Sequence, residues 1–192
     1  MIHPHTELRA VDPRIGFGVV ATRRIPKGTI TWVRDGLDQS FSAEQVAGFD
    51  PILRPMLDRY SYRDASGIYV LSWDNGRYVN HSCDANCMDP GFDIELAVRD
   101  IQPGEQLTGD YGAYNLADRF ACFCGAPNCR GRVEPVHDPA VIGRWDAAIG
   151  AAFPLLRQVE QPLWRLVQQQ REIEHALSEP HALPSSARVL MR

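Results

Sequence analysis

The strongest chemical signal in this sequence is a cluster of cysteines. Cys122, Cys124 and Cys129 lie within eight residues, on a loop rich in glycine, proline and asparagine. Thiols on such a loop can converge on one point, and a structural zinc ion binds four ligands in a closed tetrahedral site. Cys83 or Cys87, the other two cysteines, could supply the fourth thiolate. Free thiols or an oxidised pair are the alternative, but this spacing favours a structural zinc site.

Two polar segments carry further side chains that could do chemistry. The run Asn80-His81-Ser82 follows a strand-like segment at 77–79 and directly precedes Cys83. On its own, His81 is better explained as a structural histidine than as a base. Tyr111 follows an aspartate, and it could either pack in the core or direct its phenol into a cleft. Each segment alone is therefore ambiguous.

A pair of glycines in Gly16-Phe17-Gly18 is typical of a tight turn. Such a turn lets the backbone approach a ligand closely. Neither a third glycine nor a Lys-Ser/Thr pair follows at the offset that the dinucleotide and P-loop motifs require. The sequence therefore does not favour a nucleotide phosphate site.

Taken in this order, the segments resemble the SET-domain protein lysine methyltransferases that carry a post-SET zinc loop. The resemblance covers about residues 8 to 133 and rests on the glycine pair, the Asn-His-Ser-Cys run, residues 104–111 and the three closing cysteines. It implies a mainly β fold with an α appendage: a β-clip-like SET domain of small sheets with a knot-like active site, followed by C-terminal helices. The implied activity is methyl transfer from S-adenosylmethionine to a lysine amine of a protein or peptide substrate, such as a histone tail.

The resemblance also implies roles for individual residues. Tyr111 matches the family's catalytic tyrosine, whose hydroxyl lies beside the transferring methyl. Cys87 is left as a spare thiol near a structural zinc ion, whose expected ligands are Cys83, Cys122, Cys124 and Cys129. The residues expected to hold S-adenosylmethionine are Gly16, Phe17, Gly18, Asn80, His81, Tyr111 and Phe123.

The chemistry of such a site places few demands on acid and base groups. The attacking amine must be neutral, whereas the reference pKa of lysine is about 10.4. Burial in an apolar channel and a nearby sulfonium both favour the neutral amine. The protein must mainly position both partners and supply oriented oxygens. A dedicated base is therefore not required, and the sequence offers no convincing Glu or Asp for that role.

Two positions depart from the family pattern. Gly109 stands where many members have a channel Phe or Tyr, and Arg34 stands near the place of a second channel tyrosine. The gap at Gly109 either widens the channel or is filled by another aromatic such as Tyr114. The side chains that could replace the second tyrosine are Tyr60, Tyr62 and Tyr69.

These departures leave two other functions open. The site could be redirected to a small amine or to other S-adenosylmethionine chemistry, as Gly109 and Arg34 suggest. The chain could also be a non-catalytic binding module that keeps the fold and the zinc. Retention of Tyr111 and of Asn80-His81 argues against this second alternative.

Short strands must position most of these residues. Runs of β-branched or aromatic residues bounded by turn residues predict strands at 19–21, 29–33, 68–71 and 94–98. Ser42 predicts the N-cap of a short helix, and Asp138-Pro139 predicts the start of a longer one. A second helical pattern begins at Leu163, and Trp145 and Trp164 should pack on the β body. We expect a SET domain at 1–118, a post-SET zinc loop at 119–133 and a helical extension at 134–192.

Composition excludes several other classes of protein. Of the 192 residues, 44% are hydrophobic and 23% are charged, which is typical of a globular chain. No apolar run approaches the roughly 18 residues of a membrane span, so no membrane partner is expected. A net charge of −4 without a basic run argues against direct nucleic-acid binding. Without a signal-peptide pattern, we expect a cytoplasmic, bacterial-type protein, or one in a host nucleus if delivered, with a possible homodimer through the C-terminal helices.

Overall fold

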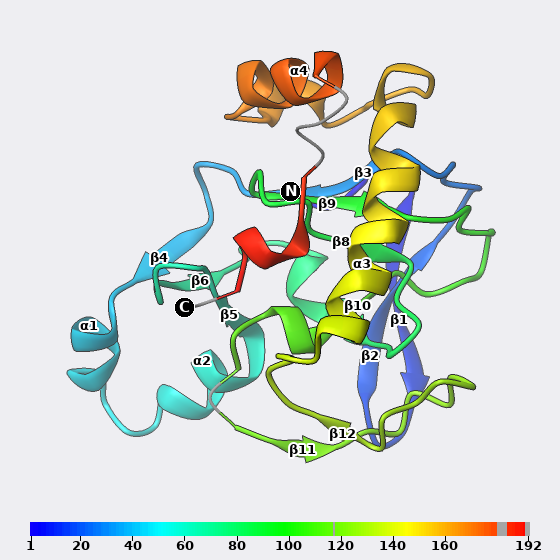
Figure 1. Cartoon of the computed structure of the whole chain (residues 1–192). Coiled ribbons are helices and arrows are strands. Elements are labelled where there is room, and N and C mark those ends of the chain that lie inside the picture. The colour runs from blue at the N-terminus through cyan, green and yellow to red at the C-terminus, as the bar shows by residue number, and fades with distance from the viewer. Residues whose placement is uncertain (117, 180–183, 191–192) are drawn as a thin grey trace.

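The computed structural model describes residues 1–116, 118–179 and 184–190. Within these ranges, small sheets form the body, and helices lie on opposite sides of it (Figure 1). The strands are β1 (Thr6–Asp12), β2 (Gly16–Ala21), β3 (Ile30–Val33), β4 (Gln39–Phe41), β5 (Ser61–Arg63), β6 (Tyr69–Leu71), β7 (Asn80–His81), β8 (Cys87–Met88), β9 (Ile94–Ala97), β10 (Thr108–Gly109), β11 (Phe120–Ala121) and β12 (Arg132–Val133). The α-helices are α1 (Ala43–Ala47), α2 (Arg54–Tyr60), α3 (Pro139–Ala152) and α4 (Gln170–Ser178).

The strands pair mostly as antiparallel neighbours. The described sheets have the orders β1-β2, β3-β9-β8, β4-β6-β5 and β11-β12, and one further sheet is the parallel pair β10-β7. The parallel pair sets Asn80 opposite Thr108 and His81 opposite Gly109. It therefore brings together two segments that lie far apart in the sequence. The arrangement of small sheets followed by C-terminal helices agrees with the mainly β fold and α appendage that the sequence predicts.

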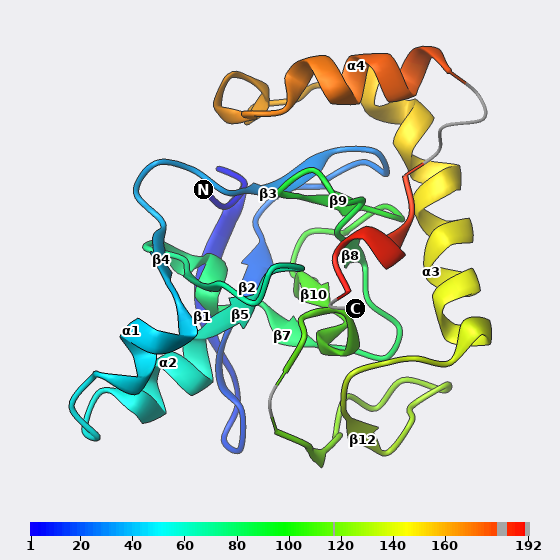
Figure 2. The same ribbon diagram turned by 60° about the vertical axis from the view of Figure 1, so that its left-hand side comes forward.

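The main core lies between the β3-β9-β8 sheet and the C-terminal helices. Ile30 and Leu96 from the sheet pack in one buried cluster with Ile149 and Phe153, and Ile173 of α4 belongs to the same cluster. Figure 2 shows α3 and α4 covering this side of the body, while α1 and α2 lie on the other side. Because burial of apolar surface stabilises the folded chain, the extension covers the core of the β body.

The two tryptophans expected at this contact lie where the sequence predicts them. Trp145 is buried, and its Nε1–H donates to Oδ2 of Asp110 at 3.2 Å. Trp164 is partly buried against the main core cluster. In the part of the chain that the structure describes, no helix is both long and apolar enough to cross a bilayer.

Most predicted elements occur, with two corrections. The four predicted strands correspond to β2, β3, β6 and β9, and Ser42 caps α1 in a capping box with Gln45. The second C-terminal helix is shorter than the pattern suggests, because a 3-10 turn at Trp164–Leu166 and extended backbone at Val167 precede α4. The strand-like segment expected at 77–79 is replaced by a 3-10 turn at Asn75–Tyr78. The side chain of Asp74 caps this turn by accepting a hydrogen bond from the N–H of Gly76.

Candidate active site

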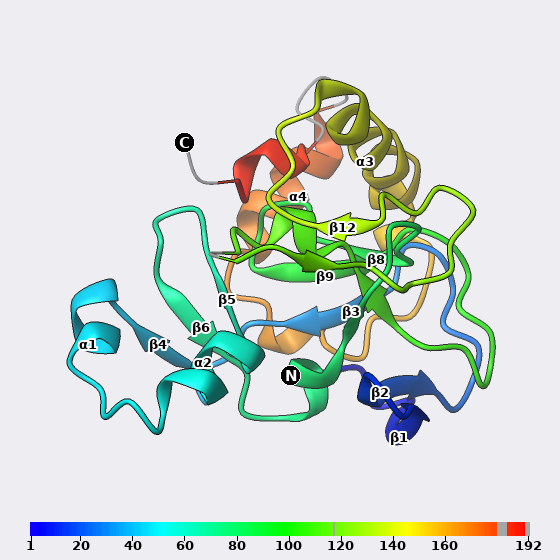
Figure 3. The same cartoon turned by 90° about the horizontal axis from the view of Figure 1, so that it is seen from below.

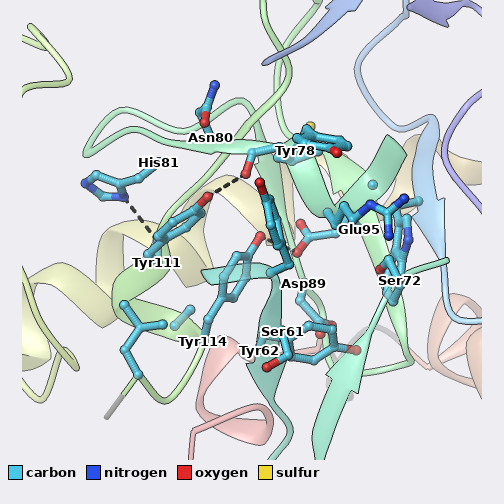
Figure 4. A pocket seen from close by; sticks show the side chains of 18 of the residues that line it. Ser61, Tyr62, Ser72, Tyr78, Asn80, His81, Asp89, Glu95, Tyr111 and Tyr114 are labelled. Carbon is cyan, nitrogen blue, oxygen red and sulfur yellow. Dashed lines mark hydrogen bonds between the residues drawn. The ribbon is translucent and has the colours of Figure 1, made fainter. Parts of the chain in front are cut away.

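The parallel pairing of β7 with β10 builds the centre of the site. It places Tyr111 next to His81, where the Tyr111 N–H donates to Nδ1 of His81 at 3.1 Å. The Tyr111 hydroxyl donates to the carbonyl of Val79 at 2.7 Å (Figure 4). These bonds fix both the backbone and the phenol of Tyr111, so the hydroxyl is held at a defined point.

Burial of His81 explains why its Nδ1 accepts the hydrogen bond from the N–H of Tyr111. Desolvation lowers the pKa of His81, although the carboxylate of Asp110 opposes this effect. A neutral imidazole can accept a hydrogen bond at Nδ1, as the contact with Tyr111 requires. His81 therefore serves to orient the tyrosine, which agrees with the structural role that the sequence favours for it.

The glycine pair meets the same centre from β2. A Cβ on Gly18 would lie 2.5 Å from Oε1 of Gln106 and 2.8 Å from Nδ2 of Asn80, so no larger residue fits without displacing them. Asn80 Nδ2 donates to the carbonyl of Phe17 at 3.0 Å and to Gln106 at 3.1 Å. Gly18 thus allows Asn80 to bridge the β2 and β10 segments.

These segments border a cavity of about 980 Å³. Of the residues predicted to hold the methyl donor, Gly18 packs behind the cavity wall, whereas the others line it: Gly16, Phe17, Asn80, His81, Tyr111 and Phe123. Phe17 and Phe123 are 52% and 66% exposed. Two exposed aromatic rings on a cavity wall can be covered by a flat apolar ligand.

Arg77 is one of the cavity residues that the sequence did not predict. Arg77 lines the cavity, and its Nε is buried without a hydrogen-bond partner among the described residues. A guanidinium on a cavity wall suits a carboxylate ligand. In the sequence, Arg77 is marked only by its position three residues before Asn80. Neither composition nor spacing singles it out as a binding residue.

The predicted zinc cysteines converge beside this cavity. The Sγ atoms of Cys83 and Cys122 are 3.8 Å apart, and the Cys122 thiol also contacts those of Cys124 and Cys129. Backbone N–H groups point at the sulfurs: Cys83 N–H donates to Cys124 at 3.5 Å, and the N–H groups of residues 130 and 131 donate to Cys83 and Cys129 at 3.4 Å. Four sulfurs with N–H donors form a set that fits a thiolate-bound zinc ion.

Two other side chains near the cluster bear on the ligand set. His81 Nε2 lies 3.3 Å from Cys83 Sγ, and His81, Cys83, Cys122 and Cys124 offer ligand atoms within 4.8 Å of one another. Cys87 lies apart, in the core cluster that contains Val19 and Leu107, and burial raises the pKa of its thiol to about 12. The structure therefore selects Cys83 over Cys87 as the upstream member of the cluster.

An ion pair links the cysteine loop to the active-site turn. Both terminal nitrogens of Arg130 donate to the buried Asp110 carboxylate, at 2.8 and 2.6 Å. Bidentate Arg–carboxylate pairs constrain orientation as well as distance. Arg130 follows the last cysteine and Asp110 precedes Tyr111. The ion pair therefore couples the conformation of the cysteine loop to the position of Tyr111.

The position of Tyr114 explains why residue 109 is a glycine. A Cβ at Gly109 would lie 2.0 Å from the Tyr114 hydroxyl oxygen. The Tyr114 ring lies beside that of Tyr111, with centroids 5.4 Å apart (Figure 4). Tyr114 therefore fills the space beside Gly109, as the interpretation with another aromatic expects.

The second departure, Arg34, is also accommodated. Arg34 is paired with Asp64 at 3.3 Å and Asp93 at 3.4 Å, at the edge of the cavity. Among the tyrosines proposed as substitutes, Tyr60 and Tyr62 line the cavity and Tyr69 does not. The Tyr62 ring packs against those of Trp32 and Tyr114, with centroids 6.0 and 5.9 Å away. An aromatic wall is thus present, built from different positions.

Comparison with known families agrees with this geometry. Residues 16–112 match the model of the SET domain family, and the chain belongs to that family. The matched range begins at the glycine pair and ends directly after Tyr111, so it contains the strands that thread together at the site. The resemblance to SET-domain lysine methyltransferases is confirmed.

Individual relatives carry histone methyltransferase names. An H3 lysine-4-specific histone-lysine N-methyltransferase of Schizosaccharomyces pombe is 39% identical over 84 residues, which cover 38% of this chain and 9% of that protein. An H3 lysine-36-specific one of Mycosarcoma maydis is 32% identical over 131 residues, covering 60% and 13%. Drosophila melanogaster Set2 is 30% identical over 138 residues, covering 64% and 6%. The chain thus spans only a small part of the length of these relatives.

Proposed function

We propose that the protein is an S-adenosylmethionine-dependent protein-lysine N-methyltransferase. The observation that carries this proposal is the position of Tyr111, which is fixed by His81 and Val79 at the wall of a cavity shared with the Gly16-Phe17 turn. Methyltransferases of the SET family use S-adenosylmethionine. The names of the relatives favour a lysine side chain of a protein as the acceptor.

The residues present fit the methyl donor, whose bound sulfonium would supply the transferable methyl. The guanidinium of Arg77, on the cavity wall, would bind its carboxylate, and Phe17 and Phe123 would cover its adenine. Asn80 and the backbone at Gly16 complete this side of the cavity. The Tyr111 hydroxyl would place an oxygen beside the reacting carbon, as electrostatic stabilisation of the transition state requires.

The other part of the cavity suits a lysine chain. Tyr62, Tyr111 and Tyr114 form an aromatic wall that would pack against the aliphatic part of the substrate side chain. Such a wall desolvates the amine and lowers its pKa, which favours the neutral nucleophile. The same wall argues against a channel widened for another kind of amine substrate, because Tyr114 fills the gap at Gly109.

We assign a structural role to zinc at the cysteine cluster. Cys83, Cys122, Cys124 and Cys129 would hold it, leaving no position for a reactive water. Zinc there would fix the loop that carries Phe123 into the cavity wall. A cytoplasmic or host-nuclear location and a homodimer through the C-terminal helices stay predictions.

Calorimetry and a methyl-transfer assay test the proposed function. The protein should bind S-adenosylmethionine, and should transfer labelled methyl to lysines of core histones or of proteins in a cell lysate. Tyr111→Phe should lower turnover by about 100-fold or more while leaving methyl-donor binding nearly unchanged. Tyr69→Phe, at a tyrosine that does not line the cavity, is the matched control and should retain activity.

Two results would contradict this assignment. A wild-type protein that does not bind S-adenosylmethionine cannot be a methyltransferase of this kind. Label that enters only small molecules, with none in protein, would instead support the small-amine alternative.

A further inference from the structure

Glu95 lies in the cavity wall, although methyl transfer as described above requires no acidic residue there. Glu95 is on β9 between Ile94 and Leu96, which are fully buried in the main core on the opposite face of the strand. Its side chain lines the cavity, and Oε1 accepts a hydrogen bond from the Tyr114 hydroxyl at 2.8 Å (Figure 4). Its Oε2 is buried without a hydrogen-bond partner among the described residues. Such an unpartnered oxygen is costly unless a ligand or a proton compensates it.

The groups facing Glu95 make this end of the cavity acidic. Desolvation raises the pKa of Glu95, and the nearby Asp89 carboxylate raises it further. Tyr62 and Cys87 face the same carboxylate, and both have raised pKa values because they are buried. The guanidinium of Arg34, which acts on Tyr62, is already paired with Asp64 and Asp93. No basic side chain in the described ranges forms an ion pair with Glu95.

The cavity thus places an unneutralised acid next to the aromatic wall that would receive a lysine. Tyr114 is the link, because its hydroxyl bonds to Glu95 while its ring lies beside that of Tyr111. A charged ammonium entering the cavity would find Tyr114 oxygen as a hydrogen-bond acceptor, with the Glu95 carboxyl directly behind it. A cation there would offset the charge of the buried acid.

Building on the proposed function, we propose that Glu95 receives, through the Tyr114 hydroxyl, the proton that the substrate amine loses before methyl transfer. An N–H bond of the ammonium breaks as the Tyr114 oxygen takes that proton, and the original Tyr114 proton passes to Oε1 of Glu95. The neutral amine then forms the N–C bond, while the C–S bond of the donor breaks and its electrons stay on sulfur. The product leaves as a methylammonium, and Glu95 later releases the proton to water.

This acceptor addresses a specific difficulty at neutral pH. With a reference pKa of about 10.4, only about one lysine amine in 800 is neutral at pH 7.5. A proton acceptor whose pKa is raised toward the working pH is better matched to this transfer than an ordinary carboxylate. The upward pKa shift of Glu95 by burial is in that direction.

The first test uses methyl transfer at different pH values. We expect Glu95→Gln to reduce kcat/KM about 100-fold at pH 7.5, and the loss to shrink steadily toward pH 10, where the free amine is abundant. Tyr114→Phe should show the same pH-dependent loss, because it removes the relay hydroxyl. Glu44→Gln, the same substitution at an exposed glutamate of α1, should behave like the wild type. A loss of equal size at every pH would show a structural role and overturn the proposal.

The second test does not depend on methyl transfer. We expect n-butylammonium chloride, a mimic of the lysine end, to bind the wild-type protein in calorimetry and to bind Glu95→Gln at least 10-fold more weakly. Equal binding by both proteins would overturn the proposal. If the wild type methylates no protein, the proposed function fails, while the butylammonium result still decides whether Glu95 receives an amine.

Discussion

Replacing Gly109 with alanine tests how the aromatic wall is packed. The added Cβ would lie 2.0 Å from the Tyr114 hydroxyl oxygen and 2.9 Å from Cζ. The ring must therefore move by about 1 Å or more to restore van der Waals distance, which breaks the 2.8 Å bond to Glu95. Overpacking costs about 1–3 kcal/mol, and loss of a hydrogen bond to an acidic group costs about 1.5–3 kcal/mol. We expect Gly109→Ala to lower the free energy of unfolding by about 2.5–6 kcal/mol.

A double-mutant cycle isolates the contact that causes this loss. Tyr114→Phe removes the hydroxyl, so the remaining approach to Cζ, at 2.9 Å, needs a shift of only about half an ångström. In the Tyr114→Phe background, Gly109→Ala should therefore cost at least about 1.5 kcal/mol less than in the wild type. Urea unfolding of the four proteins measures this coupling.

A glycine outside the site provides the matched control. Gly143 lies within α3, and a Cβ there meets no atom within 4 Å. Gly143→Ala should therefore stabilise the protein, by about 0.5–1 kcal/mol. Strictly additive effects of Gly109→Ala and Tyr114→Phe would refute the conclusion that Tyr114 fills the space at Gly109.

Two further predictions concern the metal and the pH dependence of stability. Elemental analysis should find about one zinc per chain, and Cys83→Ser should lose metal while Cys87→Ser retains it; equal zinc in both variants would place the fourth ligand elsewhere. Burial, with a smaller effect from His5, lowers the pKa of His3 from 6.5 to about 4, so between these values the unfolded chain takes up a proton that the folded chain does not. Stability should therefore fall as the pH drops from 6.5 to 4, by up to about 3 kcal/mol from this residue. His3→Gln should remove that part of the dependence in unfolding curves, and an unchanged dependence would contradict the cause.

The elements that could be predicted from the sequence are those with a local signal. β3 and β9 are runs of β-branched and apolar residues between turns, and α3 begins with an aspartate cap followed by proline. β7 and β10 have two residues each and no periodicity. Their pairing is a long-range contact, so only the family resemblance indicated that Asn80 and Tyr111 would meet.

The same distinction applies within the site. The cysteine cluster could be identified because three of its members are close in sequence, whereas spacing left Cys83 and Cys87 open and only the family resemblance favoured Cys83. Tyr114 was considered as one of the possible fillings for Gly109, but only the hydroxyl position shows that it occupies the space. Arg77 has no signal in spacing or composition, because its place on the cavity wall depends on the fold.

Glu95 shows why alternation within a strand can mislead about chemistry. A charged residue between two apolar residues ordinarily predicts a strand with one face in the core and one face in water. In β9 the apolar face does lie in the core, but the other face borders the cavity, where the carboxyl is largely removed from solvent. The pattern Ile-Glu-Leu is the same whether the polar face meets solvent or a cavity, because alternation shows only that the two faces of the strand differ. A strand whose polar face meets a cavity therefore carries a buried polar group at a position where alternation alone predicts exposure to solvent, and the role proposed for Glu95 follows from its place in the fold.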